Sequence, residues 1–358
     1  MNRSVYHTLA RQSLDGVELE DALCERILTD RRLELLPLLD AAYTVRRAHH
    51  GHAVMIHVLN NVRNGFCGEN CTYCAQGRES EAAIDLYGSK GRDEILAEAE
   101  RALRAGASRY CLVYSGRQAS TTRIEELCAI IPEIKARFPL EVCVSTGFID
   151  EQGARALKRA GLDRLNHNLN TCEERYPQVC TSHTYRDRLT TLHAAQQAGL
   201  GICSGMIVGM GESAAEVVEV AKTLRALQVH SVPVNFLVPI EGNALTQAQV
   251  LTPQYCLRVL VLFRLLHPQA DVRAAAGREY HLRSLEPLCL YPANSLFLDG
   301  YLNVTGAESQ RVYQMIQDAG FTVAGEMTQS KEMPTPTMAT LKDRMALRPA
   351  EGTVNCEP

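Results

Sequence analysis

Three cysteines on one short segment are the residues of this chain best suited to hold a metal cluster. The segment NGFCGENCTYCAQ places Cys67, Cys71 and Cys74 in a C-x3-C-x2-C arrangement. Three thiolates at this spacing can bind three irons of a cubane cluster and leave the fourth iron open, whereas electron-transfer clusters normally have four Cys ligands. The triplet therefore predicts an open, catalytic 4Fe-4S cluster. The alternatives are a zinc site, which lacks a fourth local ligand, and a chance spacing of buried cysteines.

Three further cysteines lie on separate predicted strands. Cys111 is in SRYCLVYSG, Cys143 in LEVCVSTG and Cys203 in GICSGMIVG. Side chains from different strands of a barrel converge in its interior, where three thiolates could bind a second cluster. One cysteine on a buried strand is more often a small hydrophobic residue, and this alternative stays open on the sequence pattern alone.

The composition narrows the classes of partner. The chain has 358 residues, 13 of them Cys, with 37 Lys and Arg against 41 Asp and Glu, so its formal net charge is −4. This balance gives no reason to expect nucleic acid or an anionic membrane as a partner. No apolar run of about 18 residues and no signal-peptide core are present, so we expect a cytoplasmic protein. Because disulfides are rare in that compartment, the cysteines indicate cluster or metal ligation, redox chemistry or burial.

Alternating strand and helix patterns position these cysteines. Eight short β-rich runs, each followed by an amphipathic helical stretch, extend from MIHVLNNV to QRVYQMIQDAG. This order predicts a parallel sheet with right-handed crossovers, and eight units suit closure into an α/β barrel of the (β/α)8 TIM type. Gly106, Gly161 and Gly199 follow helical stretches and are typical of left-handed C-caps. In such a barrel, functional residues lie where the strands end.

We expect three parts in the chain. Residues 1–48 have helical apolar spacing with charged faces, which predicts an N-terminal helical extension. Residues 49–325 form the barrel. Residues 326–358 are polar and contain proline, which predicts a mobile C-terminal tail to which we assign no chemistry.

The cysteine triplet resembles that of the radical S-adenosylmethionine (SAM) superfamily, whose hallmark is C-x3-C-x2-C with an aromatic residue before the last Cys, here Tyr73. The resemblance implies that the methionyl amino and carboxylate groups of SAM chelate the open iron. Reductive cleavage of SAM then yields a 5′-deoxyadenosyl radical. Because the cofactors perform the radical chemistry, no side chain is expected to act as a catalytic group itself.

Longer segments resemble the biotin synthase family over residues 50–325. They are FCGENCTYCAQ, RYCLVYSGR, LNHNLNT, SHTYRDR, CSGMIVGMGE, SVPVNFLVPIEG, VRAAAGRE and ANSLFLDGYLNV. The resemblance implies that Cys111, Cys143, Cys203 and Arg273 hold a second, sacrificial iron-sulfur cluster, of the 2Fe-2S type, that donates sulfur. Because a guanidinium is normally protonated and a poor donor to metals, an internal ion pair is the alternative role of Arg273.

The same resemblance assigns residues to the substrate dethiobiotin and to SAM. It implies that Asn168 and Asn235 contact the ureido ring, and an amide offers both the donor and the acceptor that a neutral urea needs. The alternative for the asparagine cluster is strand-end capping. The residues implied in SAM binding are Tyr73, Ser115, Asn170, Arg188 and Gly209. The alternatives are a solvated helix charge for Arg188 and a purely structural loop for Ser115.

Some residues depart from the family pattern. Cys172 and Cys180, in NTCEERYPQVC, stand where other residue types are expected. They are either bystander thiols or extra ligands, and in the second case the auxiliary cluster differs from the usual 2Fe-2S type. Asn170 stands where some relatives have Asp and can still accept a hydroxyl hydrogen bond. Four further cysteines lie in helical patterns that predict burial: Cys24, Cys128, Cys256 and Cys289.

These residues together predict a radical SAM sulfurtransferase that inserts sulfur into dethiobiotin to give biotin. We expect a homodimer, a reducing partner such as flavodoxin or ferredoxin, and loading by iron-sulfur assembly machinery. One alternative is a radical SAM enzyme of the same subgroup without sulfur insertion, of the methylornithine synthase or hydrogenase-maturation type; the strand cysteines and Arg273 argue against it. Another is a non-catalytic iron-sulfur or zinc protein, against which the open triplet and the asparagines argue.

Overall fold

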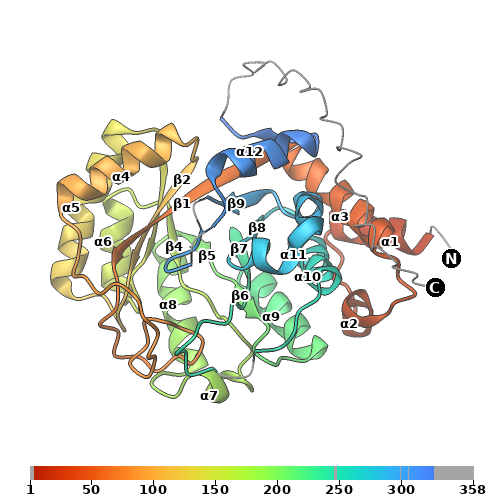
Figure 1. The fold of residues 1–358 in the computed structure, drawn as a ribbon, viewed down its shortest axis with the longest axis horizontal. Helices are drawn as coiled ribbons and strands as arrows, with labels where there is room; N and C mark the ends of the chain where they lie inside the picture. Colours follow the sequence, from red (N-terminus) through yellow and green to blue (C-terminus); the bar gives the residue numbers. More distant parts are fainter. Residues whose placement is uncertain (1–3, 246–247, 299, 305, 326–358) are drawn as a thin grey trace, which may run out of the picture. The chain divides into compact units, whose positions relative to one another are not determined.

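The computed structural model describes residues 4–245, 248–298, 300–304 and 306–325, so the predicted tail at 326–358, with Cys356, lies outside them. Strands and helices alternate along these residues (Figure 1). The strands are β1 (Ala53–Arg63), β2 (Arg109–Tyr114), β3 (Glu141–Ser145), β4 (Arg164–Asn166), β5 (Gly201–Cys203), β6 (Met206–Val208), β7 (Ser231–Phe236), β8 (Asp271–Ala274), β9 (Ser295–Phe297) and β10 (Thr322–Val323). The helices are α1 (Ser4–Leu14), α2 (Asp21–Thr29), α3 (Leu35–His50), α4 (Arg92–Arg104), α5 (Thr121–Arg137), α6 (Glu151–Arg159), α7 (Tyr176–Val179), α8 (Tyr185–Gln197), α9 (Ala214–Ala226), α10 (Pro253–Leu266), α11 (Arg278–Leu282), the 3-10 helix η1 (Arg283–Leu290) and α12 (Ser309–Asp318).

The strands close into an eight-strand parallel barrel, which confirms the predicted fold class. The order runs β1-β2-β3-β4-β5-β7-β8-β9, and β9 pairs back with β1. β6 also pairs with β7, and β10 adds to β1. The single strand predicted for GICSGMIVG is therefore divided into β5 and β6. Gly205 lies at the break, where a Cβ atom would lie 1.8 Å from the Pro233 carbonyl oxygen, so the backbone there approaches β7 more closely than any side chain allows.

Successive residues of each strand pack into two different buried environments. On β2, Tyr110 and Leu112 belong to the main hydrophobic core between the strands and the helices. Cys111 between them belongs to a separate cluster in the barrel interior, as the two-residue period of a strand requires. The buried members of that interior cluster are Cys111, Cys143, Cys203, Ala275 and Phe297.

The helix ends follow the capping signals of the sequence. Gly106, Gly161 and Gly199 have φ values of 77°, 92° and 73°, which confirms the predicted left-handed C-caps. The N-terminus of α8 has a capping box, in which the side chain of each of Thr184 and Asp187 accepts a hydrogen bond from the backbone N–H of the other. Residues next to each helix therefore fix where these crossover helices begin and end.

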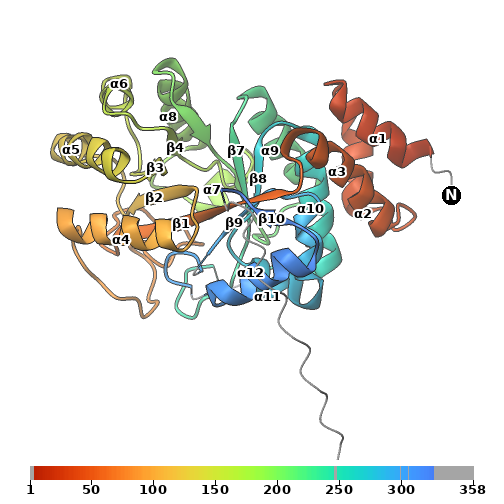
Figure 2. The same ribbon diagram turned by 90° about the horizontal axis from the view of Figure 1, so that it is seen from above.

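The three N-terminal helices lie together beside α10 on one side of the barrel (Figure 2). The Ser13 hydroxyl donates to the carbonyl of Leu265 over 2.6 Å, and Arg258 of α10 donates to the carbonyl of Ile27 over 2.7 Å. Because α10 is covered on both sides, its residues from Cys256 to Leu266 are all buried. The domain boundary at residues 48 and 49 stays a prediction.

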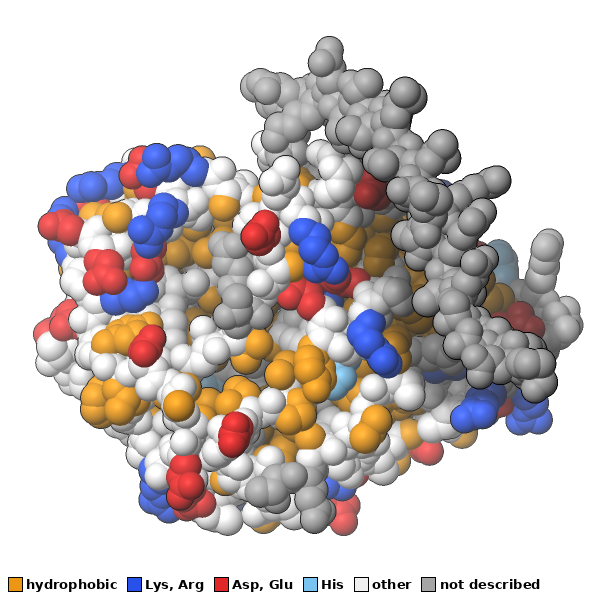
Figure 3. Space-filling view, viewed as in Figure 1, with side chains coloured by type: hydrophobic (Ala, Val, Ile, Leu, Met, Phe, Trp, Pro, Cys, Tyr) orange, Lys and Arg blue, Asp and Glu red, His pale blue; other side chains and the backbone are white. Residues whose placement is uncertain are grey.

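No helix among the described residues is long and apolar enough to cross a membrane. On the face seen in Figure 1, hydrophobic side chains gather near the centre (Figure 3).

Candidate active site

One cavity of about 310 Å³ brings both cysteine triplets together. It is lined by Cys67, Cys71 and Cys74 from the loop after β1, and by Cys111, Cys143 and Cys203 from β2, β3 and β5. Further sequence-predicted residues line the same cavity: Tyr73, Ser115, Asn168, Asn170, Arg188, Asn235 and Arg273. Residues separated by more than 200 positions thus face one space at the carboxyl ends of the strands, where barrel enzymes place their sites.

The strand cysteines form a hydrogen-bonded series inside the barrel. Cys111 and Cys143 occupy paired positions of β2 and β3, and Cys203 is the last residue of β5. A hydrogen bond from Cys143 lowers the pKa of the Cys111 thiol, while that same contact raises the pKa of Cys143. Hydrogen bonding to Cys143 and burial also raise the pKa of Cys203. The three thiols are therefore close enough to ligate one group.

Arg273 completes this layer. Its Nη1 lies 3.9 Å from Cys203 Sγ, its Nη2 donates to the Ser231 hydroxyl over 2.9 Å, and its guanidinium lies 4.7 Å from the centre of the Phe297 ring. Its Nε is buried and has no hydrogen-bond partner among the described residues. A buried polar group without a partner is rare, so this atom fits a site whose remaining ligand is a bound group.

A charged layer closes the barrel below the cysteines. Arg109 is 2% exposed and lies 3.2 Å from Asp271 Oδ2, and Arg164 lies 3.3 Å from the same carboxylate. Burial raises the pKa of Asp271, but Arg164, Arg109 and Arg273 outweigh it and lower the pKa overall. Arg109 lies two positions before Cys111, and Asp271 two positions before Arg273. Because side chains two positions apart on a strand point to the same side, this spacing could have predicted that Arg109 and Asp271 face the barrel interior.

The cluster loop is held in a compact turn. The backbone N–H of Cys74 donates to the Cys71 carbonyl and that of Gly77 to the Cys74 carbonyl, each over 3.0 Å. A Cβ atom at Gly77 would lie within 3.4 Å of three carbonyl oxygens, those of Glu69, Cys71 and Cys74, so only glycine fits there without displacement. This turn presents the three thiols to the cavity together, as an open cluster requires.

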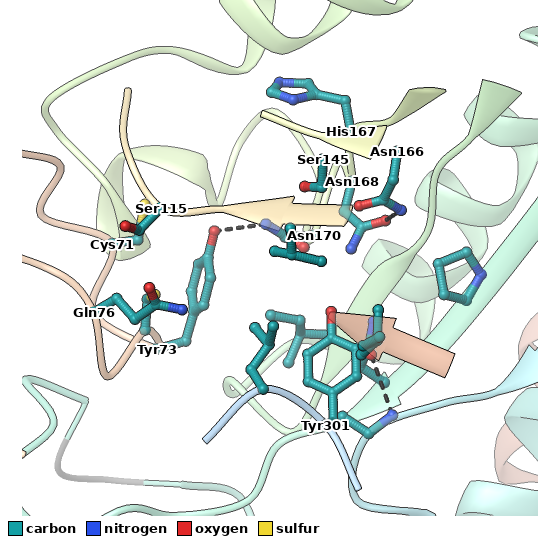
Figure 4. Close-up of a pocket in the computed structure, with 18 of the residues that line it drawn as sticks. Cys71, Tyr73, Gln76, Ser115, Ser145, Asn166, His167, Asn168, Asn170 and Tyr301 are labelled. Atoms are coloured by element: carbon teal, nitrogen blue, oxygen red, sulfur yellow. Dashed lines mark hydrogen bonds between the residues drawn. The ribbon is translucent and has the colours of Figure 1, made fainter. Parts of the chain in front are cut away.

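Tyr73 and Asn170 connect the cluster loop to the end of β4. Nδ2 of Asn170 donates to the Tyr73 hydroxyl over 2.5 Å (Figure 4). Asn170 has a φ of 70°, a left-handed conformation that Asn tolerates better than most residues. Gln76 accepts from the Gly65 N–H over 3.0 Å and so fixes the start of the same loop.

Arg188 is buried beside this contact, so the alternative of a solvated helix charge is wrong. Its Nη1 donates to the Asn168 carbonyl over 2.8 Å, and its Nη2 lies 3.4 Å from the Tyr73 hydroxyl. Burial lowers its pKa, but Tyr73, Tyr176 and Cys71 outweigh that effect and raise the pKa overall. Arg188 is therefore a permanent positive charge facing the cavity near Cys71.

The two substrate-side asparagines are partly engaged with the backbone. Asn168 Oδ1 accepts from the Gly205 N–H over 3.1 Å, while no described group accepts from its Nδ2. Nδ2 of Asn235 donates to the Met206 carbonyl over 3.1 Å, and its Oδ1 accepts from the Ala276 N–H over 3.3 Å. The predicted alternative of strand-end capping therefore accounts for only some of the hydrogen bonds that each amide can make. Each side chain still has an amide N–H to donate toward the cavity.

Comparison with protein families gives matches along most of the barrel. The model of the radical SAM superfamily matches residues 62–224, and that of the biotin and thiamin synthesis associated domain matches residues 233–322. Biotin synthase of Magnetococcus marinus is 55% identical over 298 residues, 83% of this chain and 93% of that protein. Biotin synthase of Acaryochloris marina is 46% identical over 92% of this chain and 95% of that protein.

The chain belongs to the biotin synthase family. It is accordingly a radical SAM enzyme whose cofactors are a 4Fe-4S cluster, SAM and an auxiliary iron-sulfur cluster. The solved structure of a methylornithine synthase shares the fold of this chain, with 19% sequence identity and a TM-score of 0.77. The match covers 88% of this chain and 97% of that chain. The FeFe-hydrogenase maturase of Carboxydothermus hydrogenoformans shares that fold too, at 18% identity, TM-score 0.76 and coverage of 89% and 79%. These likenesses show the fold alone.

Of the residues predicted to bind SAM in this biotin synthase family member, Gly209 lies outside the cavity and Ser115 lies in its lining. Gly209 does not line the cavity: Leu237 and Leu251 pack against its Cα, where a Cβ atom would lie 3.3 and 3.1 Å from them. The Ser115 hydroxyl donates to the Gly65 carbonyl, so it fixes the cluster loop from the end of β2. Gly209 therefore allows close side-chain packing and Ser115 supports the backbone of the cluster loop, and the contact of either residue with SAM stays a prediction.

The two cysteines that depart from the biotin synthase pattern lie apart from the strand cysteines. Cys172 donates to Glu216 Oε1 of α9 over 3.6 Å. Cys180 lies 3.6 Å, sulfur to sulfur, from Cys71 of the cluster loop. No described contact joins either of them to Cys111, so the structure gives no support to extra ligands for the auxiliary cluster.

Several site residues were missed by sequence reasoning. Tyr301 lines the cavity, and its ring meets Phe297 edge-on at 5.5 Å between centroids. Glu69 contacts His183 Nδ1 and lies 3.1 Å from Arg117. Tyr301 lies in the segment ANSLFLDGYLNV, whose match to the family was its only signal. Nothing in the spacing of Glu69 and His183 connects them, because they are 114 positions apart.

Proposed function

We propose that this chain inserts sulfur into dethiobiotin to give biotin, with its two cysteine triplets holding two clusters across one cavity. Cys67, Cys71 and Cys74 hold the 4Fe-4S cluster. The auxiliary cluster, of 2Fe-2S type, is held by Cys111, Cys143, Cys203 and Arg273. The observation on which this proposal most depends is that both triplets line the same cavity of about 310 Å³.

The auxiliary site suits an iron-sulfur cluster. Its three thiols are buried, and their hydrogen bonds through Cys143 place them within reach of one bound group. The unpartnered Nε of Arg273 is available to the same group. The sequence alternative of an internal ion pair fits Arg273 less well, since its described hydrogen bonds go to Cys203 and Ser231 rather than to a carboxylate.

The cofactor end of the cavity suits SAM. Arg188 offers its buried guanidinium to a methionyl carboxylate, and such a charge-assisted contact is strong. Tyr73 and Asn170 present a hydroxyl and an amide beside it for the ribose. When bound, SAM on the open iron supplies the hydrogen-abstracting radical and the auxiliary cluster supplies the sulfur.

Dethiobiotin lies between the two ends in this proposal. Asn168 and Asn235 face its ureido ring with their remaining amide N–H groups. Phe297 and Tyr301 supply apolar wall on the auxiliary side, and burial there keeps water from the reacting carbons. The chain's own task is thus to orient an unactivated substrate between two fixed sites.

The remaining partners rest on the family and not on a feature of the fold. The proposal includes a homodimer in the cytoplasm, a reducing partner such as flavodoxin or ferredoxin, and loading by iron-sulfur assembly machinery. A chemical reductant replaces the protein reductant in a first test.

The test is anaerobic reconstitution with iron and sulfide, followed by assay with dethiobiotin, SAM and a chemical reductant. Wild type is expected to form biotin and 5′-deoxyadenosine. The Cys74→Ala variant forms neither, while Cys128→Ala, which removes a half-buried cysteine of α5, matches wild type. Cleavage of SAM by wild type without any biotin would contradict the proposed reaction.

A further inference from the structure

Cys180 has no task in the proposed reaction, although it touches a proposed cluster ligand. Its Sγ lies 3.6 Å from Cys71 Sγ, and the two residues come from loops 109 positions apart. Cys71 lines the cavity and Cys180 does not, so Cys180 does not face the bound cofactors. Cys180 is 3% exposed, so the surrounding residues fix the position of its side chain.

His183 joins the two thiols in one group. Its Nδ1 lies 3.3 Å from Cys180 Sγ, and the ligand atoms of Cys71, Cys180 and His183 all lie within 4.8 Å of one another. In a tetrahedral zinc site with bonds of about 2.3 Å to sulfur and about 2.0 Å to nitrogen, two sulfurs lie about 3.8 Å apart and sulfur and nitrogen about 3.5 Å apart. The Cys71–Cys180 distance of 3.6 Å and the Cys180–His183 distance of 3.3 Å are close to these edges.

The surroundings of His183 favour a cation on its Nδ1 side. Nε2 contacts the Tyr176 hydroxyl at 2.7 Å and Arg188 Nη2 at 3.0 Å, so that side of the ring is occupied. On the other side, the Glu69 carboxylate contacts Nδ1 and adds negative charge. A cation on Nδ1 would displace this contact, and the Glu69 carboxylate beside it would offset part of the cation's charge.

We propose that Cys71, Cys180 and His183 bind a zinc-class divalent cation when the 4Fe-4S cluster is absent. The two thiols each release a proton to solvent, the proton between Nδ1 and Glu69 also leaves, and His183 binds through Nδ1 with no change of oxidation state. Because one thiolate cannot serve both sites, the bound cation excludes cluster assembly until it is removed. This consequence rests on the proposed function through Cys71, whereas the binding itself does not.

The test uses the full-length chain purified anaerobically without reconstitution. Co²⁺ is the probe, because its absorption reports thiolate ligands, and Zn²⁺ is then titrated against it. Cys180→Ser and His183→Gln are expected to weaken Co²⁺ binding by about 100-fold or more, since second-shell changes alone cost 10–100-fold. Cys172→Ser, a buried cysteine of the same β4–α8 connection, is the matched control and binds as wild type does. Equal affinity in Cys180→Ser and wild type overturns the proposal, since the cation then binds the other cluster cysteines.

A second measurement keeps the proposal testable if a variant fails to fold. Wild type is alkylated with and without Zn²⁺, and the labelled cysteines are identified by mass spectrometry. Zn²⁺ is expected to protect Cys71 and Cys180 while Cys67 and Cys74 react; equal protection of Cys67, Cys71 and Cys74 overturns the proposal. Loading of the 4Fe-4S cluster is measured separately in Cys180→Ser. If this variant still binds four irons in that cluster, the proposed function stands, whether or not the variant binds Zn²⁺.

Discussion

Cys111 on β2 and Cys143 on β3 are paired residues of the parallel register, one strand apart in the barrel wall. Their side chains both face the interior, where they share a hydrogen bond. Because neighbouring strands of a sheet are fixed by backbone hydrogen bonds, this pair is positioned by the barrel and needs no loop to hold it. The proposed sulfur-donating site is thus built on the strands of the barrel, whereas the proposed radical cluster site is built on a loop.

Replacement of Cys143, the middle thiol of the series, separates the two sites. Cys143→Ala is expected to lose the auxiliary iron and to stop biotin formation, while 5′-deoxyadenosine is still produced because the cluster loop is untouched. Cys256→Ala, a buried cysteine of α10, is the control for loss of a buried thiol. Iron and sulfide counts with chromatography of both products check this, and loss of both products in Cys143→Ala alone would argue against two separate sites.

Arg188→Lys tests the assigned carboxylate contact. A lysine keeps the charge but not the planar donor pair, so SAM binding is expected to weaken by about 1.5–3 kcal/mol, roughly 10- to 150-fold. Arg186→Lys, an exposed position of the same helix, is the control. Equilibrium dialysis with the reconstituted protein measures the affinity, and an unchanged value in Arg188→Lys would place the carboxylate elsewhere.

Gly205→Ala tests the break between β5 and β6. The added Cβ would lie 1.8 Å from the Pro233 carbonyl oxygen, so β7 must shift, and we expect a loss of about 3 kcal/mol in the unfolding free energy. At Gly199→Ala the added Cβ would meet only the Lys158 side chain, at 4.0 Å, but the φ of 73° is strained for alanine, and the change is expected to cost about 1–2 kcal/mol. Urea denaturation of both variants compares them, and a smaller loss in Gly205→Ala would show that the barrel absorbs the clash.

Glu216 makes stability depend on pH. Burial raises its pKa, but hydrogen bonds from Arg175 and the Ser213 backbone outweigh it and lower the pKa from 4.5 to about 2. A carboxylate with a lowered folded-state pKa contributes stability that is complete above its unfolded pKa and is lost as the pH falls from about 4.5 toward 2. Glu216→Gln is therefore expected to be less stable than wild type by about 1–2 kcal/mol at pH 7. Urea midpoints at pH 7 and pH 3 check this, since the gap must shrink at pH 3; a constant gap would mean that the charge contributes nothing.

The eight-strand order and the convergence of the strand cysteines could be predicted, because both depend on local periodicity. Cys111, Cys143 and Cys203 each alternate with residues of the outer core, and this two-residue period fixes which face they share. The contact of Cys71 with Cys180 could not be predicted, because it depends on how two loops meet. Likewise, the close approach of Gly205 to Pro233 that divides the fifth strand is a tertiary effect that no pattern in GICSGMIVG records.

The proposed sulfur insertion depends most on the strand cysteines holding a cluster distinct from that of the loop. The direct measurement is Mössbauer spectroscopy with iron and sulfide counts on reconstituted wild type and on the Cys111→Ala/Cys143→Ala/Cys203→Ala variant, both assayed with dethiobiotin and SAM. We predict two cluster types and biotin in wild type, and one cluster type with 5′-deoxyadenosine but no biotin in the variant. The same single cluster in both proteins, with no biotin from either, would contradict the account.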